Sequence, residues 1–415
     1  MNRLILILFL IIYIIPLFGQ NQEKEKEKTK LKLEVHGFVK TDYWIDTRQV
    51  VYAREGLFTF FPKDILLDKN GQDINAESSF NFSAITSRVN LKVQQFKAFG
   101  AEAYGFIEAD FSGASNITIN TFRLRHAFIH LNWGKDELLL GQYWHPLFVT
   151  KVFPTVVSLN TGAPFQPFNR SPQIRYTHHF GKWNFIAAVI SQRDYSNIGP
   201  QGRNPAYMQN SMVPNGHLQL QYVGNKNTFG IAADYKSIRP QMLSDSNFIS
   251  NEQLGSYAFM AYYKWTNTKL EYKMKALYGQ NLSDQLMLGG YAVASIDPIT
   301  AIQKYTPTNH FFIWADILYK KKLKKVTLIP GFFMGYSKNL GTSKDAIGPY
   351  YAVGANIDQM YRLAPSFSVK SGNTMFSFEW EHSHVMYGDI QLDGTVANTH
   401  AVAGNRFLLT GFYFF

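Results

Sequence analysis

The sequence predicts an all-β protein, a transmembrane antiparallel β-barrel, and three observations carry that prediction. Apolar and polar residues alternate with period two along most of the 415 residues, as expected for strands with one apolar and one polar face. The predicted strands are joined alternately by short turns and by long polar loops, an arrangement typical of outer-membrane barrels. The mean hydropathy of −0.17 is too polar for a bundle of membrane-spanning helices.

The first thirty residues are expected to be a leader and a linker. Residues 1–20 (MNRLILILFLIIYIIPLFGQ) combine a basic Arg3, a short apolar run and a small Gly19, which indicates a cleaved signal peptide and export to the outer membrane. An uncleaved helical anchor is the alternative, but the apolar run is short for a membrane span. Residues 21–30 contain QEKEKEKTK and are predicted to form a charged periplasmic linker. The chain has no cysteine, so disulfides cannot stabilise it.

Residues 31–415 are predicted to form the transmembrane β-barrel. In the first strand Leu33, Val35 and Val39 lie on one face while Lys32 and Glu34 lie on the other. An even number of strands puts both ends of the barrel on one side of the membrane. The sixteen predicted strands are residues 31–46, 79–95, 100–111, 120–133, 136–144, 173–179, 183–192, 214–223, 228–237, 254–265, 269–279, 308–319, 325–336, 359–370, 374–387 and 402–415.

A barrel of this size has room for a water-filled lumen, whereas about eight strands enclose only side chains. A soluble β-sandwich is the alternative, but it does not explain why short and long connections alternate. The final strand NRFLLTGFYFF alternates in polarity and ends on Phe415, similar to the assembly signal of outer-membrane barrels. Aromatic residues at strand ends, such as Tyr257 and Trp265, are expected to form girdles at the two membrane interfaces.

The third long external loop, residues 145–172, is predicted to fold into the lumen as a constriction loop. It is too long to be an ordinary connection in a compact domain unless it has a function. No Asp or Glu occurs between Leu138 and Arg193, while five Lys and Arg residues do. Its prolines favour a stiff path. This loop is therefore the predicted determinant of what passes.

Strand parity sorts the side chains of the wall, and the basic residues that face inward are the candidate pore-lining set. Arginine and lysine at a narrow place favour anions and repel cations. The alternative is that the strand arginines pair with Glu102, Glu108 and Asp110 in a neutral structural network. The candidates, including two from the constriction loop segment, are Arg88, Lys92, Arg123, Arg125, Lys151, Arg170, Arg175, Arg362 and Arg406.

Two stretches resemble a known family. The runs RLRHAFIHLNW, LLLGQYWHPLF and NTGAPFQPFNRSPQIRYT, and later MYRLAPSFSVKSGNTMFSFEWEHSHVMYG, are similar to the DcaP-like porins of the outer membrane. The resemblance implies a sixteen-stranded, homotrimeric channel with an inward third loop, and a bias toward anionic solutes such as dicarboxylates. The other loops show no such similarity.

No catalytic or metal-binding motif occurs in the sequence, and no cofactor is expected. G-x-S-x-G, P-loop and H-E-x-x-H patterns are absent. His382 and His384 could suggest a metal site, but they share parity with Trp380 and are predicted to face outward. The net charge of +11 would suit nucleic acid, which an exported protein rarely meets.

The sequence thus predicts a non-enzymatic porin in contact with outer-membrane lipid, a passive diffusion channel for small hydrophilic solutes with a preference for anions. Two alternatives stay open. One is an adhesin or surface-binding barrel that acts through its external loops. The other is a barrel-type hydrolase, whose site residues would be scattered along the chain. A transporter of hydrophobic solutes is disfavoured, because the first strand starts about ten residues after the leader, with no room for a plug domain.

Overall fold

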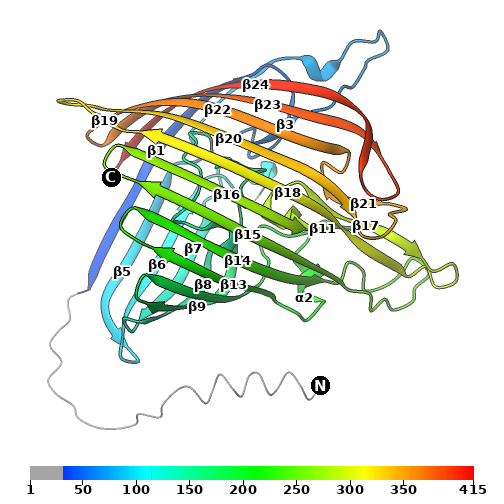
Figure 1. Cartoon of the computed structure of the whole chain (residues 1–415), viewed down its shortest axis with the longest axis horizontal. Helices are drawn as coiled ribbons and strands as arrows, with labels where there is room; N and C mark the ends of the chain where they lie inside the picture. The colour runs from blue at the N-terminus through cyan, green and yellow to red at the C-terminus, as the bar shows by residue number, and fades with distance from the viewer. Residues whose placement is uncertain (1–30, 114) are drawn as a thin grey trace.

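The computed structural model describes residues 31–113 and 115–415 (Figure 1). The predicted signal peptide and linker, residues 1–20 and 21–30, lie outside the described residues. Within this described part of the chain, no helix is long and apolar enough to cross a membrane.

A closed antiparallel β-barrel accounts for most of the chain. The main sheet has twenty strands, of which β4, β17, β19 and β21 are short pieces beside longer strands, so sixteen strands form the wall. Each wall strand pairs with its neighbour in the sequence, and β1 pairs with β24 to close the barrel. The wall strands are β1 (Lys32–Asp46), β5 (Arg88–Ala98), β6 (Ala101–Asp110), β7 (Arg123–Asn132), β8 (Asp136–Trp144), β9 (Arg170–Phe180), β10 (Trp183–Ile190), β13 (Asn215–Val223), β14 (Asn227–Ile238), β15 (Leu254–Thr266), β16 (Leu270–Gln280), β18 (Gln303–Tyr319), β20 (Thr327–Thr342), β22 (Ile357–Ser371), β23 (Thr374–Ile390) and β24 (Val396–Phe414).

The remaining elements are short and belong to the connections. They are β2 (Val50–Ala53), β3 (Phe58–Pro62), β4 (Ser79–Ser83), β11 (Ile198–Gly199), β12 (Gly202–Arg203), β17 (Gly289–Ile296), β19 (Lys321–Lys322), β21 (Tyr350–Val353), the helix α2 (Ala206–Gln209) and the 3-10 turns η1 (Ile74–Ala76), η2 (Asn116–Thr118), η3 (Pro146–Phe148) and η4 (Leu282–Gln285).

Period-two alternation places apolar side chains outward, as β24 illustrates. Leu409 and Tyr413 are more than half exposed on the outer surface, while Arg406 and Thr410, which lie at the other parity, are buried inside. A strand with this pattern suits a wall between lipid and lumen, because one face is apolar and the other is polar. Its backbone groups pair with both neighbouring strands, as a lipid environment requires. The prediction of a sixteen-stranded antiparallel barrel is confirmed.

The two ends of the barrel differ in their connections. Short turns gather at the left end in Figure 1 and long loops at the right end. Phe99 and Gly100 alone join β5 to β6, with φ of 53° and 78°, the left-handed values that a tight two-residue hairpin requires. The two ends are named here the turn side and the loop side.

A β-bulge in β7 resolves the competing parities of RLRHAFIHL. Glu108 pairs with His126 and Ala109 with Leu124, so Arg125 is the extra residue of the bulge. The bulge shifts the alternation, so that Arg125 and His126 are both buried inside.

The interior is filled on one side by three segments that fold inward from the loop side: the β2–β3 hairpin, residues 145–169 and residues 281–288. Their apolar side chains, such as Phe60 and Phe165, form one buried cluster with inward-facing wall residues such as Trp314. Alternation of polarity is weaker in β14–β23 because the inner face of these strands meets packed side chains rather than water.

Two segments predicted as external loops, residues 47–78 and 280–307, therefore turn partly inward. The physical reason lies in their apolar runs. Phe58, Phe60 and Phe61 of β3 and the apolar residues that follow η4 are buried in the central cluster. The inward course of residues 145–172 matches the predicted constriction loop.

Closure at the β1 edge requires a small residue at position 37. A Cβ on Gly37 would lie 2.2 Å from the carbonyl oxygen of Arg88 and 2.8 Å from the ring of Phe415. We expect Gly37→Ala to lower the free energy of unfolding by about 1–3 kcal/mol, because strand pairing must open to admit the methyl group. Urea unfolding of the refolded barrel measures this change.

Gly105→Ala in β6 is the matched control, because a Cβ at Gly105 meets no atom within 4 Å. Equal stability of the two variants would contradict the close approach at Gly37.

Candidate functional site

The segment predicted as the constriction loop, residues 145–172, is shorter than expected, because β9 begins at Arg170. Residues 145–169, which keep the name constriction loop, cross the lumen and lie against the inner face of β16–β23. The loop starts at η3, where the ring of Phe148 stacks on Trp144 with centroids 3.8 Å apart. His145 bonds Asn215 of β13 at 2.7 Å, and Phe165 packs against Phe333 of β20. The aromatic side chains of the loop thus anchor it to the wall.

Wall carboxylates bind the backbone N–H groups of this acid-free loop. Glu379 accepts from the amide of Val157 at 2.7 Å and from that of Ser158 at 2.9 Å. Asp316 accepts from the amide of Thr155 at 3.1 Å. Glu381 accepts from the side-chain amide of Asn160 at 2.8 Å. These acids accept hydrogen bonds from the loop and line neither of the cavities described below.

Wall cations bind the carbonyl oxygens of the same loop. Lys275 donates to Leu147 at 2.8 Å and to Phe148 at 3.0 Å. Arg362 donates to Ala163 at 2.8 Å and to Phe60 of the β2–β3 hairpin at 2.6 Å. Backbone groups that cross a lumen need such partners, because unpaired buried groups are costly.

A cavity of about 710 Å³, named here the loop-side cavity, opens between the β2–β3 hairpin, the constriction loop and β7. Five basic side chains line it, against two carboxylates. The basic residues are Arg54, Lys63, Arg123, Arg125 and Arg203, and the acidic residues are Asp64 and Asp194.

The arginines of β7 are held by two acids of β6. Arg123 and Arg125 approach Asp110 at 2.9 Å and 2.8 Å, and Arg125 also meets Glu108 at 2.7 Å. Arg88 lies 3.7 Å from Glu108. The predicted alternative of arginines paired with strand acids is therefore part of the structure, although Glu102 lies near the turn side and is exposed.

Arg170 adds a cation that no carboxylate binds among the described residues. It is buried between the rings of Trp144, Phe168 and Tyr195, with its carbon centre 4.8–5.2 Å from their centroids. It donates to the Tyr195 hydroxyl at 2.5 Å, while its Nε and one terminal nitrogen have no partner. Four guanidinium groups, those of Arg88, Arg123, Arg125 and Arg170, thus accompany two carboxylates.

The field of this group reaches Tyr195 in the loop after β10. Burial alone would raise the pKa of the Tyr195 hydroxyl, but Arg170, Arg123 and Arg54 hold it below its ordinary value. A phenol stabilised as an anion reports a positive local potential. The region beside the loop-side cavity is therefore electropositive.

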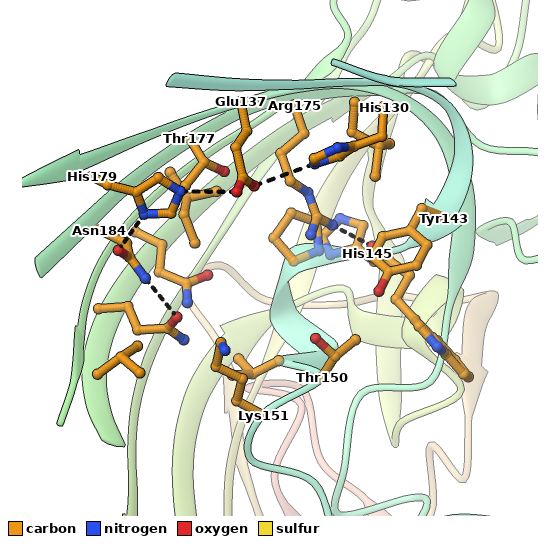
Figure 2. A pocket seen from close by; sticks show the side chains of 18 of the residues that line it. His130, Glu137, Tyr143, His145, Thr150, Lys151, Arg175, Thr177, His179 and Asn184 are labelled. Carbon is orange, nitrogen blue, oxygen red and sulfur yellow. Dashed lines mark hydrogen bonds and ion pairs between the residues drawn. The ribbon is translucent and has the colours of Figure 1, made fainter. Parts of the chain in front are cut away.

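A second cavity of about 540 Å³, named here the turn-side cavity, lies between the constriction loop and the wall from β6 to β13 (Figure 2). Lys151, Arg175 and Lys182 line it, against the single carboxylate of Glu137. Arg175 donates to Gln173 at 2.9 Å and to the carbonyl oxygen of Trp144. Both cavities lie along the half of the lumen that the loop leaves free.

The nine predicted pore-lining residues do not form one cluster. Arg123 and Arg125 line the loop-side cavity, while Lys151 and Arg175 line the turn-side cavity. Arg175 of β9 therefore lies in a different cavity from the β7 candidates Arg123 and Arg125.

The other candidates have structural contacts. Arg362 holds two inward segments, and Arg406 pairs with Asp46 at 2.7 Å and donates to the carbonyl oxygen of Gly56. Arg88 lies over the ring of Phe38 and Lys92 over that of Tyr104. None of these four lines either cavity.

Sequence parity could not find Arg54, Lys63 and Arg203, because they come from loops. The position of Tyr195 could not be predicted from strand parity either, because it lies in the loop after β10. Arg54 and Lys63 flank β3, whose apolar run FTFFP turns inward, whereas no such signal marks Arg203 or Tyr195. His382 and His384 are partly exposed on the outer side of β23 with Trp380, as predicted. Within residues 31–113 and 115–415, no group of three or more His, Asp or Glu residues could hold a metal ion.

A closed sixteen-stranded barrel with an inward third loop defines the porin-type barrels of the outer membrane. Residues 28–228 match the family model described as DcaP outer membrane protein. The chain is an outer-membrane β-barrel, and the match over residues 28–228 confirms the resemblance to the DcaP-like porins seen in the sequence. No curated protein sequence matches the chain.

Solved structures extend this likeness over the whole barrel. The outer membrane channel DcaP of Acinetobacter baumannii is similar at 14% identity, with a TM-score of 0.70, covering 95% of this chain and 100% of that chain. An anion-selective porin from Comamonas acidovorans is similar at 9% identity and a TM-score of 0.54, covering 93% and 100%. Outer-membrane expressed OmpT of Vibrio cholerae is similar at 9% identity and a TM-score of 0.54, and the match covers 95% of this chain and 100% of that chain. At such identities the likeness shows the fold alone.

The contacts of Glu379 give a test of how the loop is held. We expect Glu379→Ala to raise the hydrogen-exchange rate of the Val157 and Ser158 amides about tenfold or more, because hydrogen bonds to a charged group contribute about 1.5–3 kcal/mol each. Mass spectrometry of peptides covering residues 150–164 measures the exchange. Glu77→Ala, on an exposed external residue, is the control. Unchanged exchange in Glu379→Ala would show that the ring contacts alone hold the loop.

Proposed function

We propose that this protein is a passive diffusion channel for small hydrophilic solutes and that it prefers anions, dicarboxylates among them. The observation that carries the proposal is the excess of basic over acidic side chains in both cavities, on the half of the lumen that the constriction loop leaves free. A non-catalytic role is part of the proposal.

The size of the barrel supports passage. Barrels of about sixteen strands are wide enough for an aqueous channel. The constriction loop and its two companion segments fill one side, so a solute would travel along β5–β13. The channel named DcaP and the anion-selective porin among the similar structures support the same reading.

The arginine groups support a preference for carboxylates. A guanidinium can bind a carboxylate through two parallel hydrogen bonds, and Arg123 has a terminal nitrogen without a partner. A low-dielectric wall strengthens the field of such charges. With basic groups in both cavities, a solute with two carboxylates would meet a favourable partner above and below the loop. This is how Arg123, Arg125, Lys151 and Arg175 would act, while Arg170, buried behind the loop-side cavity, would add its charge to the field.

Assembly and export complete the proposal. A homotrimer is supported by the sequence resemblance and by the trimer form of OmpT among the similar structures. Residues 1–20 would be removed on export. The apolar outer surface of the barrel would contact outer-membrane lipid.

Planar-bilayer recording tests the channel itself. We expect purified protein to insert with discrete conductance steps, and a salt gradient to give a reversal potential on the anion side. Absence of steps would overturn the proposed channel. Steps with cation preference would overturn only the anion part.

The β7 arginines allow a sharper test of selectivity. We expect Arg123→Ala combined with Arg125→Ala to lower the anion-to-cation permeability ratio about twofold or more, since two lost charges act across a few ångströms of partly screened space. Arg193→Gln, at an exposed arginine outside both cavities, is the control.

A charge-balanced variant distinguishes the electrostatic effect of the arginines from their effect on the shape of the wall. Arg123→Gln with Asp110→Asn removes one cation and one anion together, so the permeability ratio is expected to stay close to that of the unaltered protein. Equal losses in the balanced and the double-alanine variants would show that the arginines act only by shaping the wall.

A further inference from the structure

A chain of hydrogen bonds runs along the wall of the turn-side cavity, on the side opposite Lys151 (Figure 2). Glu137 of β8 lies between two imidazole rings, with Oε2 3.3 Å from His130 Nε2 and Oε1 3.0 Å from His179 Nε2. His179 Nδ1 lies 2.7 Å from Asn184 Oδ1. Asn184 donates onward to Gln221 at 3.3 Å, which donates to the Tyr262 hydroxyl at 2.9 Å.

Both ring nitrogens of His179 face oxygen acceptors. Only the doubly protonated ring donates to Glu137 and Asn184 at the same time. The neutral ring would retain the bond to Glu137, but the Asn184 amide would have to turn round, against its bond to Gln221. His179 is about one-third exposed to the cavity, so protons reach it.

His130 is placed differently, although it binds the same carboxylate. Its Nδ1 is buried without a partner, and its ring packs on Tyr104 at 4.8 Å. The ammonium of Lys92 lies over that same Tyr104 ring at 4.5 Å. A proton on His130 Nδ1 would have no acceptor and would add a charge near Lys92. By contrast, Nδ1 of His179 faces Asn184 Oδ1, so His179 is the ring on which a second proton has an acceptor.

The surroundings of His179 are charged on every side of the cavity. Asp136 and His178 pair with each other on the outer surface of the barrel and do not face the lumen. Besides His179, the charged and titratable groups that line the cavity are Tyr104 from β6, His130 from β7, Glu137 and Tyr143 from β8, Arg175 from β9, Lys182 from the β9–β10 turn, and His145 and Lys151 from the constriction loop.

We propose that His179 is a selectivity residue of the turn-side cavity and that its protonation sets the net charge of that cavity. This inference rests on the proposed channel function. When His179 is protonated, its positive charge offsets the negative charge of Glu137. The net charge of the cavity then comes from Arg175, Lys151 and Lys182. Without the proton on His179, the carboxylate faces passing solutes. Anion preference then rises as the pH falls through the range in which His179 takes up its proton.

Reversal potentials at about pH 8 and about pH 5.5 test the proposal, since histidine changes charge between them. We expect the anion-to-cation permeability ratio of the unaltered protein to be about twofold higher at the acidic pH, for one unit charge near the path. His179→Gln should lose most of that change and stay near the alkaline value.

His178→Gln is the matched control, because it alters the neighbouring residue on the outer face. It should behave as the unaltered protein does. His36, exposed on β1, is present in every variant, so only the difference between variants is used. His130→Gln should keep most of the change.

Glu137→Gln gives a second, independent measurement if His179→Gln folds poorly. Without the carboxylate, anion preference at alkaline pH should rise to the level that the unaltered protein shows at acidic pH. Full pH dependence in His179→Gln, or no rise in Glu137→Gln, would overturn the inference. Both results require a conducting channel, so they are distinct from failure of the proposed function, in which no steps occur.

Discussion

The pairing of buried backbone groups is the constraint on which this structure depends. In lipid, the wall must be a closed sheet, because no water reaches its N–H and C=O groups. Inside, the same rule applies to the chain that crosses the lumen. The constriction loop has no regular hydrogen-bond pattern, so Glu379, Asp316, Lys275 and Arg362 supply the partners that a neighbouring strand would supply elsewhere.

This use of wall charges divides the lumen into two unequal halves. On β16–β23, Glu379, Asp316, Lys275 and Arg362 bind the backbone of the constriction loop. Along β5–β13, both cavities are lined by more basic than acidic side chains, and the loop adds Lys151 but no carboxylate. The lack of Asp and Glu in the loop therefore matters less for its own folding than for the space beside it, where basic groups outnumber carboxylates.

The sixteen strands could be predicted because lipid on one side enforces a period of two, and Leu409 and Tyr413 show it to the last strand. Strand parity predicted which side chains point inward, but not which of them line free space in the lumen. Arg362 and Arg406 point inward as predicted, but they bind inward segments and meet no free cavity. The inward course of β3 could not be read, because its Phe58, Phe60 and Phe61 resemble any apolar run. Arg54 and Lys63 came from that hidden segment, and strand alternation carries no information about loop packing.

The seam between the first and last strands has a consequence for how the chain acquires its shape. Gly37 and Phe415 exchange backbone hydrogen bonds at 3.0 Å and 3.1 Å, so the barrel joins residues from opposite ends of the described chain. Every other neighbour in the wall is local in sequence. Until β24 is made and docked, β1 and the growing strand each present an open edge, and such edges template aggregation. Ring closure is thus the slow, late event, and an exported chain must be kept unpaired until all its strands are present.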